Sequence, residues 1–123
     1  MGRELSEIQD VVEVLRHMGC LAWRNSTGAH RTRSGGWVKV GLGKGGPDVV
    51  GMLPGGRFLG LKLKLGDDRL KEHQREWLSS VRELGAAVAV VGSAREVADV
   101  VERFLAGDEP DPEQFVFKKL NDS

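Results

Sequence analysis

Hydrophobic residues recur along this chain with two different periods, and these periods predict an alternation of helices and strands. Helical spacing is found from Ile8 to Leu15, from Leu70 to Leu84 and from Val97 to Leu105. Leucines occupy every second position from Leu59 to Leu65, as in a strand with one buried face. Ala86 to Val91 is apolar throughout, which is typical of a strand covered on both faces. The pattern predicts an α/β fold with a central sheet flanked by helices.

Capping residues set the expected starts of two helices. Ser6 followed by Gln9 predicts a capping-box start for the first helix, which Gly19 then ends. Ser93 followed by Glu96 predicts the same kind of start for the last helix. Both helices are therefore expected to begin directly after a serine.

The segments between the helices are expected to be strands and one polar loop. Leu21 to Arg24 and Trp37 to Val40 are predicted as short strands. Asn25 to Gly28 and His30 to Gly36 carry polar, basic and flexible residues without apolar periodicity, which predicts a loop. The strand–helix–strand order from Leu59 to Val91 predicts a right-handed crossover onto a mixed sheet.

A tight hairpin is expected to gather charged residues on one face of the sheet. Pro54-Gly55-Gly56 is typical of a turn, and folding the chain symmetrically about Gly55 pairs Asp48 with position 62. Opposed residues of a ladder point to the same face. We therefore expect Asp48, Lys62 and Lys64 to lie together, with the leucines of that strand on the opposite, buried face.

Length and composition narrow the class of protein. The chain has 123 residues, of which 40% are hydrophobic, and this suits one compact domain. The single cysteine, Cys20, excludes an internal disulfide and a cysteine-rich zinc site. No apolar run reaches the roughly 18 residues of a membrane span, and the charged N-terminus differs from a signal peptide. These features predict a cytoplasmic, bacterial or phage-encoded protein without a membrane partner.

The charges are distributed unevenly, although the 18 basic and 18 acidic residues cancel to a formal net charge of zero. Val14 to Pro47 contains no Asp or Glu but several Arg and Lys residues. A local basic surface sets the affinity for phosphates through counterion release, although scattered surface charge is the simpler alternative. The residues expected to contact DNA are Arg24, Asn25, Ser26, His30, Arg31, Arg33 and Lys44.

The two ends of the chain are expected to differ in role. Residues 1–107 are predicted to form the folded domain, and residues 108–123 an acidic, proline-bearing linker and tail. Phe115 to Leu120 is apolar enough to dock on its own domain or on a partner chain.

Several motifs stand in an order that is typical of one nuclease family. They are a first helix with Glu7 and Gln9, WRNSTG at Trp23–Gly28, GGPD at Gly45–Asp48, the hairpin, the strand with Lys62-Leu63-Lys64, and RLKEHQ at Arg69–Gln74. Over roughly residues 4 to 105 this order resembles the virus-type replication-repair nuclease (VRR-NUC) domain of the D/E-x-K nuclease superfamily. The resemblance implies a restriction-endonuclease-like fold and a metal-dependent endonuclease that cuts branched DNA, such as four-way junctions, as a homodimer.

The resemblance also implies a catalytic role for several residues. Asp48, Glu7 and the backbone carbonyl of Leu63 would hold Mg²⁺ or Mn²⁺. Lys64 would orient or deprotonate the attacking water or stabilise the transition state, and Gln74 would hold Lys64 or the water. The simpler alternatives are that Glu7 complements the helix dipole and that Gln74 is a structural amide.

Lys62 departs from the family pattern, because it stands where the family has the Glu of E-x-K. An ammonium group cannot ligate a metal, and Lys62 is expected to lie opposite Asp48, where the ion belongs. The departure predicts weak or absent metal binding and impaired catalysis, as in an inactivated variant or a natural pseudo-nuclease. Two alternatives are a non-catalytic DNA-binding module and a protein-interaction domain.

Overall fold

The computed structural model describes residues 2–26, 28–40, 45–66 and 68–109, with the backbone alone for 2–4, 28–31 and 38–40. Ten elements follow one another along the chain: α1 (Gly2–His17), β1 (Leu21–Arg24), β2 (Gly28–Arg31), β3 (Trp37–Val40), β4 (Val49–Met52), β5 (Phe58–Leu63), α2 (Glu72–Glu83), β6 (Ala87–Val91), the 3₁₀ turn η1 (Ala94–Glu96) and α3 (Val97–Leu105).

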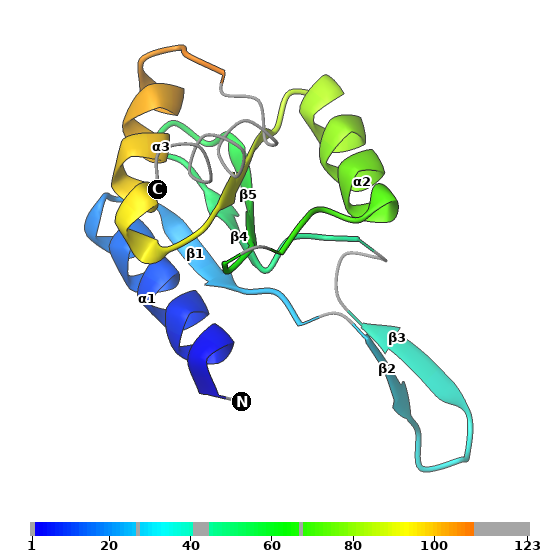
Figure 1. Cartoon of the computed structure of the whole chain (residues 1–123). Helices are drawn as coiled ribbons and strands as arrows, with labels where there is room; N and C mark the ends of the chain where they lie inside the picture. The colour runs from blue at the N-terminus through cyan, green and yellow to red at the C-terminus, as the bar shows by residue number, and fades with distance from the viewer. Residues whose placement is uncertain (1, 27, 41–44, 67, 110–123) are drawn as a thin grey trace.

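The expected α/β fold with a mixed central sheet is confirmed. Four strands form this sheet in the order β1-β4-β5-β6. β4 runs antiparallel to both β1 and β5, whereas β6 follows α2 and lies parallel to β5. In Figure 1, α1 and α3 lie on one side of the sheet and α2 lies on the other. The molecule is therefore a three-layer sandwich of helix, sheet and helix.

Each helix buries the apolar stripe that its sequence predicts. The main core joins α1 and α3 to one face of the sheet, and its larger members are Ile8, Val11, Val12, Leu15, Leu59, Leu61, Leu63, Val97, Val100, Val101 and Phe104. On the other face, α2 covers β6 through Leu70, Leu78, Val88 and Val90. All five residues of β6 are buried, as the apolar run predicts for a strand between two helical layers.

The register of the β4–β5 hairpin agrees with the sequence. Val49 pairs with Leu61 and Met52 with Phe58, so the ladder is symmetric about Gly55. Gly55 has a φ of 104°, a left-handed conformation that glycine adopts without a steric cost. The ladder ends at Val49 and Leu61, and Asp48 N–H donates to Leu61 O at 2.9 Å, so Asp48 lies just beyond the ladder, with its side chain beside that of Lys62.

The expected start of the first helix is wrong. α1 begins at Gly2, so Ser6 and Gln9 lie inside it. Gln9 donates to Glu13 one turn later, over 3.5 Å, and does not cap the helix. The residues before Ser6 include Arg and Glu, which favour helices, and this propensity allows the helix to start a turn earlier.

The last helix also starts differently from the prediction. Ser93 stands at the N-cap position of the short 3₁₀ turn η1 without a capping bond from its side chain, and α3 begins only at Val97. The Glu96 carboxylate accepts from Gly92 N–H at 2.7 Å, one residue before the expected partner. Leu84 and Leu105, placed by periodicity on the buried stripes, are exposed because they stand at helix ends, where the chain leaves the core.

The predicted loop before Trp37 is in part a strand. β2 pairs with β3 over four residues, from Gly28 opposite Val40 to Arg31 opposite Trp37, in a separate two-stranded sheet. Figure 1 shows this hairpin projecting away from the body of the domain. The two strands satisfy their backbone hydrogen bonds by pairing with each other. Because the hairpin projects from the body, its sequence lacks the apolar alternation by which a half-buried strand is recognised.

One half of the sheet face beside α2 has no helical cover. Leu21, Met52 and Phe58 form one row across β1, β4 and β5, and all three are among the exposed large hydrophobic residues. In the described part of the chain, no helix is both long and apolar enough to span a membrane. The tail segment Phe115 to Leu120 lies outside the described residues.

Candidate active site

Asp48 lies at the entrance of β4, where the backbone of three segments meets. Its N–H donates to Leu61 O at 2.9 Å, and its carbonyl accepts from Asn25 N–H at 2.9 Å. The Asn25 side-chain amide also donates to Pro47 O at 2.9 Å. The Asp48 carboxylate oxygen Oδ2 accepts from Leu63 N–H at 2.6 Å, a short charge-assisted bond. These bonds hold the carboxylate against the end of β5.

Lys62 faces Asp48 as the register predicts. Its Nζ lies 3.4 Å from Asp48 Oδ1 and 3.5 Å from the Gly46 carbonyl oxygen. The side chains of Lys62 and Asp48 are only 14% and 17% exposed. Both distances are long for hydrogen bonds, so the contact is mainly an attraction between charges in a partly desolvated site. The expectation that these two residues share one face is confirmed.

Lys64 is a buried lysine directly after β5. Its backbone N–H donates to Val91 O at 2.9 Å, which continues the ladder with β6. Its side chain is 6% exposed, and its Nζ lies 3.7 Å from Oδ2 of Asp68, whose own side chain is 61% exposed. Burying an ammonium group with so distant and hydrated a partner costs free energy.

The electrostatics of Lys64 reflect its burial. Desolvation is the largest effect and lowers the pKa of Lys64 from its ordinary value. The carboxylates of Asp68 and Asp48 raise this pKa, and the ammonium groups of Lys62 and Lys71 lower it. A buried lysine with a lowered pKa is a group that can exchange a proton or receive an anion.

Gln74 lies in the first turn of α2 and is buried. Its side-chain oxygen accepts from Lys71 N–H at 2.8 Å, so it caps the start of the helix. A Cβ on Gly45 would collide with the backbone of His73, so glycine there allows the GGPD segment to pass directly beside this helix turn. The structure thus gives Gln74 a structural bond, and a contact with Lys64 or a water stays a prediction.

Glu7, on α1, lies at the same end of the sheet as Lys64, because it bonds to the turn after β6 and β6 ends beside β5. Its Oε1 accepts from Ala94 N–H at 2.8 Å, and Glu96 accepts from Gly92 N–H close by. The two carboxylates therefore hold the turn that follows β6, next to the end of β5. Because α1 begins at Gly2, Glu7 lies beyond the first turn of its own helix, and its bond instead holds the turn after β6. A metal-binding role for Glu7 stays a prediction.

The residues expected to contact DNA are divided between the body and the β2–β3 hairpin. Arg24, Ser26 and Arg33 are exposed. Asn25 is partly buried and ties the chain to the segment before β4. The side chains of the remaining three lie outside the described part of the structure: His30, Arg31 and Lys44.

Comparison with known proteins identifies the family. The family model of the VRR-NUC domain matches residues 3–95 of this chain. The chain belongs to the VRR-NUC family. A solved structure described as a VRR-NUC domain shares 23% sequence identity with it, at a TM-score of 0.57, over 80% of this chain and 95% of that one. At this identity the likeness supports the fold alone. Comparison with curated proteins gives no match.

The donor set of this VRR-NUC domain does not fit a divalent metal as it stands. The Asp48 carboxylate already contacts Lys62 and Leu63 N–H. Within the described residues, no group of three or more His, Cys, Asp or Glu side chains could hold an ion. The Leu63 carbonyl would face the same side as its N–H, toward Asp48, because both groups of a strand residue point to one neighbouring strand. One carboxylate and one carbonyl beside an ammonium group are a poor site for Mg²⁺.

The structure adds one residue to the site that the motifs did not single out. Lys71 lies close enough to Lys64 to lower its pKa. It stands inside the Arg69–Gln74 motif, directly before α2, so its place in the motif was the available signal. Lys62 contacts the Asp48 carboxylate, and Lys64 and Lys71 add further positive charge to the candidate active site.

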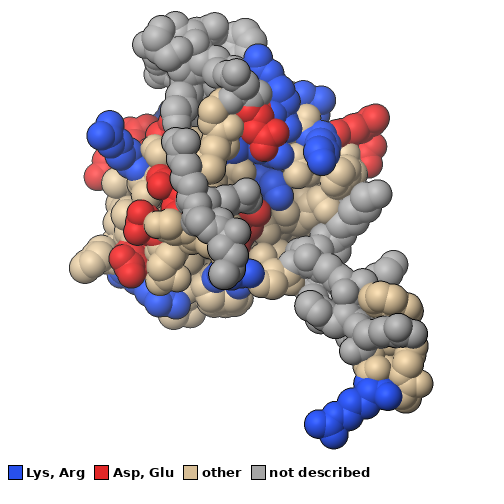
Figure 2. Space-filling model, turned by 60° about the horizontal axis from the view of Figure 1, so that its bottom comes forward, with Lys and Arg blue, Asp and Glu red and all other residues tan. Residues whose placement is uncertain are grey.

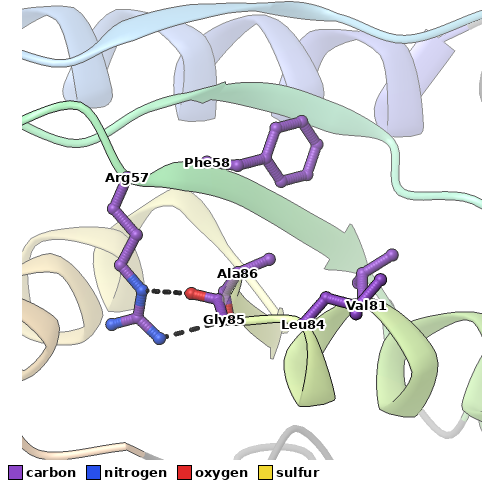
Figure 3. Close-up of a pocket in the computed structure, with 6 residues that line it drawn as sticks. All are labelled: Arg57, Phe58, Val81, Leu84, Gly85 and Ala86. Carbon is purple, nitrogen blue, oxygen red and sulfur yellow. Dashed lines mark hydrogen bonds between the residues drawn. The ribbon is translucent and has the colours of Figure 1, made fainter.

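A cavity of about 400 Å³ lies at the opposite end of β5 from Lys62 and Lys64, and Phe58, Val81 and Leu84 are among its lining residues. Figure 3 shows the Arg57 side chain beside it, directed at the backbone of Gly85 and Ala86. The lining is largely apolar, and its basic group is already bonded. This cavity is separate from the VRR-NUC site.

Proposed function

We propose that this VRR-NUC domain binds branched DNA at the Asp48 site, and that Lys62 occupies the place of a divalent metal there, so that phosphodiester hydrolysis is impaired. VRR-NUC domains are nuclease-type domains with DNA as the partner. The observation that carries the proposal is the 3.4 Å contact between Lys62 Nζ and Asp48 Oδ1 in a site largely shielded from water.

Hydrolysis of a phosphodiester needs an activated water and compensation for charge on the transition-state oxygens, which a hard metal on carboxylates supplies. A Glu at position 62 would join Asp48 and Glu7 as a third carboxylate. With Lys62 the same positions carry two carboxylates and one ammonium group. The attraction for a divalent cation falls accordingly, and the attraction for a DNA phosphate rises.

Lys64 can act on DNA in either form of the site. As a buried ammonium group it can bind a phosphate oxygen, and its lowered pKa favours proton exchange with a water. Lys62 and Lys71 add positive charge around it. The basic site therefore supports binding of a phosphate even where hydrolysis is weak.

The decisive experiment compares the natural chain with Lys62→Glu on a labelled four-way junction in Mn²⁺ and in Mg²⁺. We expect Lys62→Glu to bind the metal in calorimetry and to cut the junction several orders of magnitude faster than the natural chain. Lys62→Gln is the matched control, because it removes the positive charge without adding a ligand. Equal cleavage by the natural chain and Lys62→Glu would show that position 62 is not a metal ligand and would move the assignment to acids such as Asp68.

A second candidate function is a DNA-binding module without catalysis, favoured by the mismatch between the donor set and a metal. In that case Lys62→Glu would stay inactive, and fluorescence anisotropy would still show salt-dependent binding of the junction. A protein without either property would be an interaction domain.

We also propose that the domain acts as a two-fold dimer, because symmetric cutting of a junction needs two related sites. The exposed row of Leu21, Met52 and Phe58 offers an apolar face for that contact. Light scattering should give twice the chain mass at micromolar concentration, and Met52→Lys should halve it. A monomer in both cases would contradict the dimer.

A further inference from the structure

The β2–β3 hairpin is an arm without a core of its own. Among the described elements, its two strands make their substantial contacts with each other alone. Figure 1 shows the arm pointing away from the sandwich. An isolated two-stranded hairpin is at best marginally stable in water, so an arm of this kind is suited to lie against a partner.

The charge of the arm indicates what that partner is. The whole window from Val14 to Pro47 lacks acidic residues. At the described end of the arm, Arg33 is exposed and Trp37 is 68% exposed. In Figure 2 the described part of the arm shows basic and uncharged residues only, whereas acidic residues are seen over the body. A basic, projecting ribbon is complementary to the phosphates of nucleic acid.

The tip of the arm has a defined conformation. Thr32 N–H donates to Gly36 O at 2.8 Å, and Gly35 N–H donates to Thr32 O at 3.0 Å. The Thr32 hydroxyl accepts from Gly36 N–H at 3.1 Å. Gly35 has a φ of 92°, which only glycine adopts readily. The backbone around Arg33 is therefore held by hydrogen bonds, which lowers the entropy cost when Arg33 contacts a partner.

The root of the arm lies at the candidate active site. Asn25, at the start of the segment that leads into β2, bonds through its N–H to Asp48 O and through its side chain to Pro47 O. Pro47 and Asp48 end the segment that leads out of β3. Asn25, which precedes β2, and Pro47 and Asp48, which follow β3, are thus bonded to each other beside the carboxylate that faces Lys62.

We propose that the β2–β3 arm is a ribbon that lies in the major groove of a DNA duplex flanking the site, with its tip about two thirds of a helical turn from the phosphate held at Asp48. The major groove is about 12 Å wide and admits a two-stranded ribbon. From Asn25 to Thr32, where the turn begins, the chain advances seven residues, and at about 3.3 Å per residue this reaches at most ~23 Å, about two thirds of the roughly 34 Å of one turn of DNA. This inference rests on the proposed function, because it requires DNA at the site.

The length of duplex beside the site tests the proposal. Junctions with arms of about 6 and about 16 base pairs, which stop short of the tip or pass beyond it, are titrated with the natural chain by anisotropy. We expect the long-armed junction to bind about tenfold more tightly, and Arg33→Ala with Trp37→Ala to remove most of that difference. Arg95→Ala, an exposed arginine on the body, is the matched control and should keep it.

A chemical footprint locates the groove. Guanine N7, which faces the major groove, should be protected from dimethyl sulfate about seven base pairs from the junction centre by the natural chain and not by the double variant. Circular dichroism checks that both proteins are folded. Protection of adenine N3 in the minor groove instead would overturn the assignment.

The outcomes separate the arm from the site. Tight binding that does not depend on duplex length would overturn the ribbon and leave the proposed function intact. A natural chain that binds no junction of either length would overturn both. A double variant that loses its dimer in light scattering and keeps the length dependence would show that the arm contacts a second copy of the chain, which also overturns the ribbon.

Discussion

The two ends of β5 carry basic residues that have opposite relations to their surroundings. Arg57, just before the strand, donates to Gly85 O at 2.6 Å and to Ala86 O at 3.3 Å. It also pairs with Glu109 at 2.6 Å. Lys64, just after the strand, is more deeply buried and has an ion partner only at 3.7 Å. The strand thus has a satisfied cation at one end and a poorly paired one at the other.

The difference separates a structural cation from a candidate catalytic one. The guanidinium of Arg57 joins the β4–β5 turn to the chain after α2, as Figure 3 shows, and it also pairs with Glu109. It lies 5.8 Å from the centre of the Phe104 ring. Its donors are used within the fold. Lys64 is buried at a cost without comparable bonds, which is typical of a group retained for binding or chemistry.

The largest expected effect concerns cleavage. In the Lys62→Glu background, Lys64→Ala should lower the junction cleavage rate by several orders of magnitude, because the group that handles the water or the phosphate is lost. Arg57→Ala in the same background should leave the rate of the folded protein within about threefold. Rates would be measured under single-turnover conditions at saturating metal. A similar loss of rate in both variants would mean that Lys64 and Arg57 do not differ in role.

The second effect is on the free energy of unfolding, which substitutions at Arg57 and Lys64 should change in opposite directions. Arg57→Ala should lower the free energy of unfolding by about 1–2 kcal/mol, because it leaves two carbonyls and a carboxylate without their partner at a site with partial access to water. Lys64→Met should raise it by about 1 kcal/mol, because a methionine of similar volume removes a buried charge. Urea titrations at neutral pH measure both. Destabilisation by Lys64→Met would show that the lysine is better paired than its distances indicate.

The third effect is a pH dependence confined to Lys64. Burial lowers its pKa in the folded protein below the ordinary value of 10.5. Between the lowered pKa and 10.5 the unfolded chain binds more protons at this position than the folded one, so the stability of the natural chain gains with rising pH there. The advantage of Lys64→Met should therefore shrink as pH rises through that window. The difference between the natural chain and Arg57→Ala should stay flat, since a guanidinium does not titrate there.

The smallest expected effect is at Asp68. Its carboxylate is 61% exposed and lies 3.7 Å from Lys64 Nζ, so Asp68→Asn should change stability by no more than about 0.5 kcal/mol. The same change should lower the pKa of Lys64 further, because a carboxylate that raises it is removed. NMR titration of the lysine Nζ resonance measures the shift. A rise in this pKa would mean that Asp68 does not act on Lys64 as an ion partner.

Local pattern was sufficient for much of the fold. The apolar stripes of the three helices, the buried run of β6 and the symmetric turn at Gly55 are each encoded within a few residues, and the structure confirms them apart from Leu84 and Leu105, which are exposed at helix ends. The position of Asp48 opposite Lys62 followed from counting outward from that turn, because a two-residue period fixes which side chains share a face. The family also followed from motif order, and the family model confirms it.

Tertiary structure decided what depends on partners far apart in the sequence. β2 is a strand only because β3 pairs with it, and Glu7 holds Ala94 across 87 positions of the chain. The burial of Lys64, and its distance of 3.7 Å from Asp68, depend on the segments that meet at the end of β5, which no local pattern specifies. The residues themselves determined which charges face one another along β5, because that depends on local periodicity. How strongly those charges are desolvated was set by the layers above and below the sheet, because desolvation depends on everything that excludes water from a site.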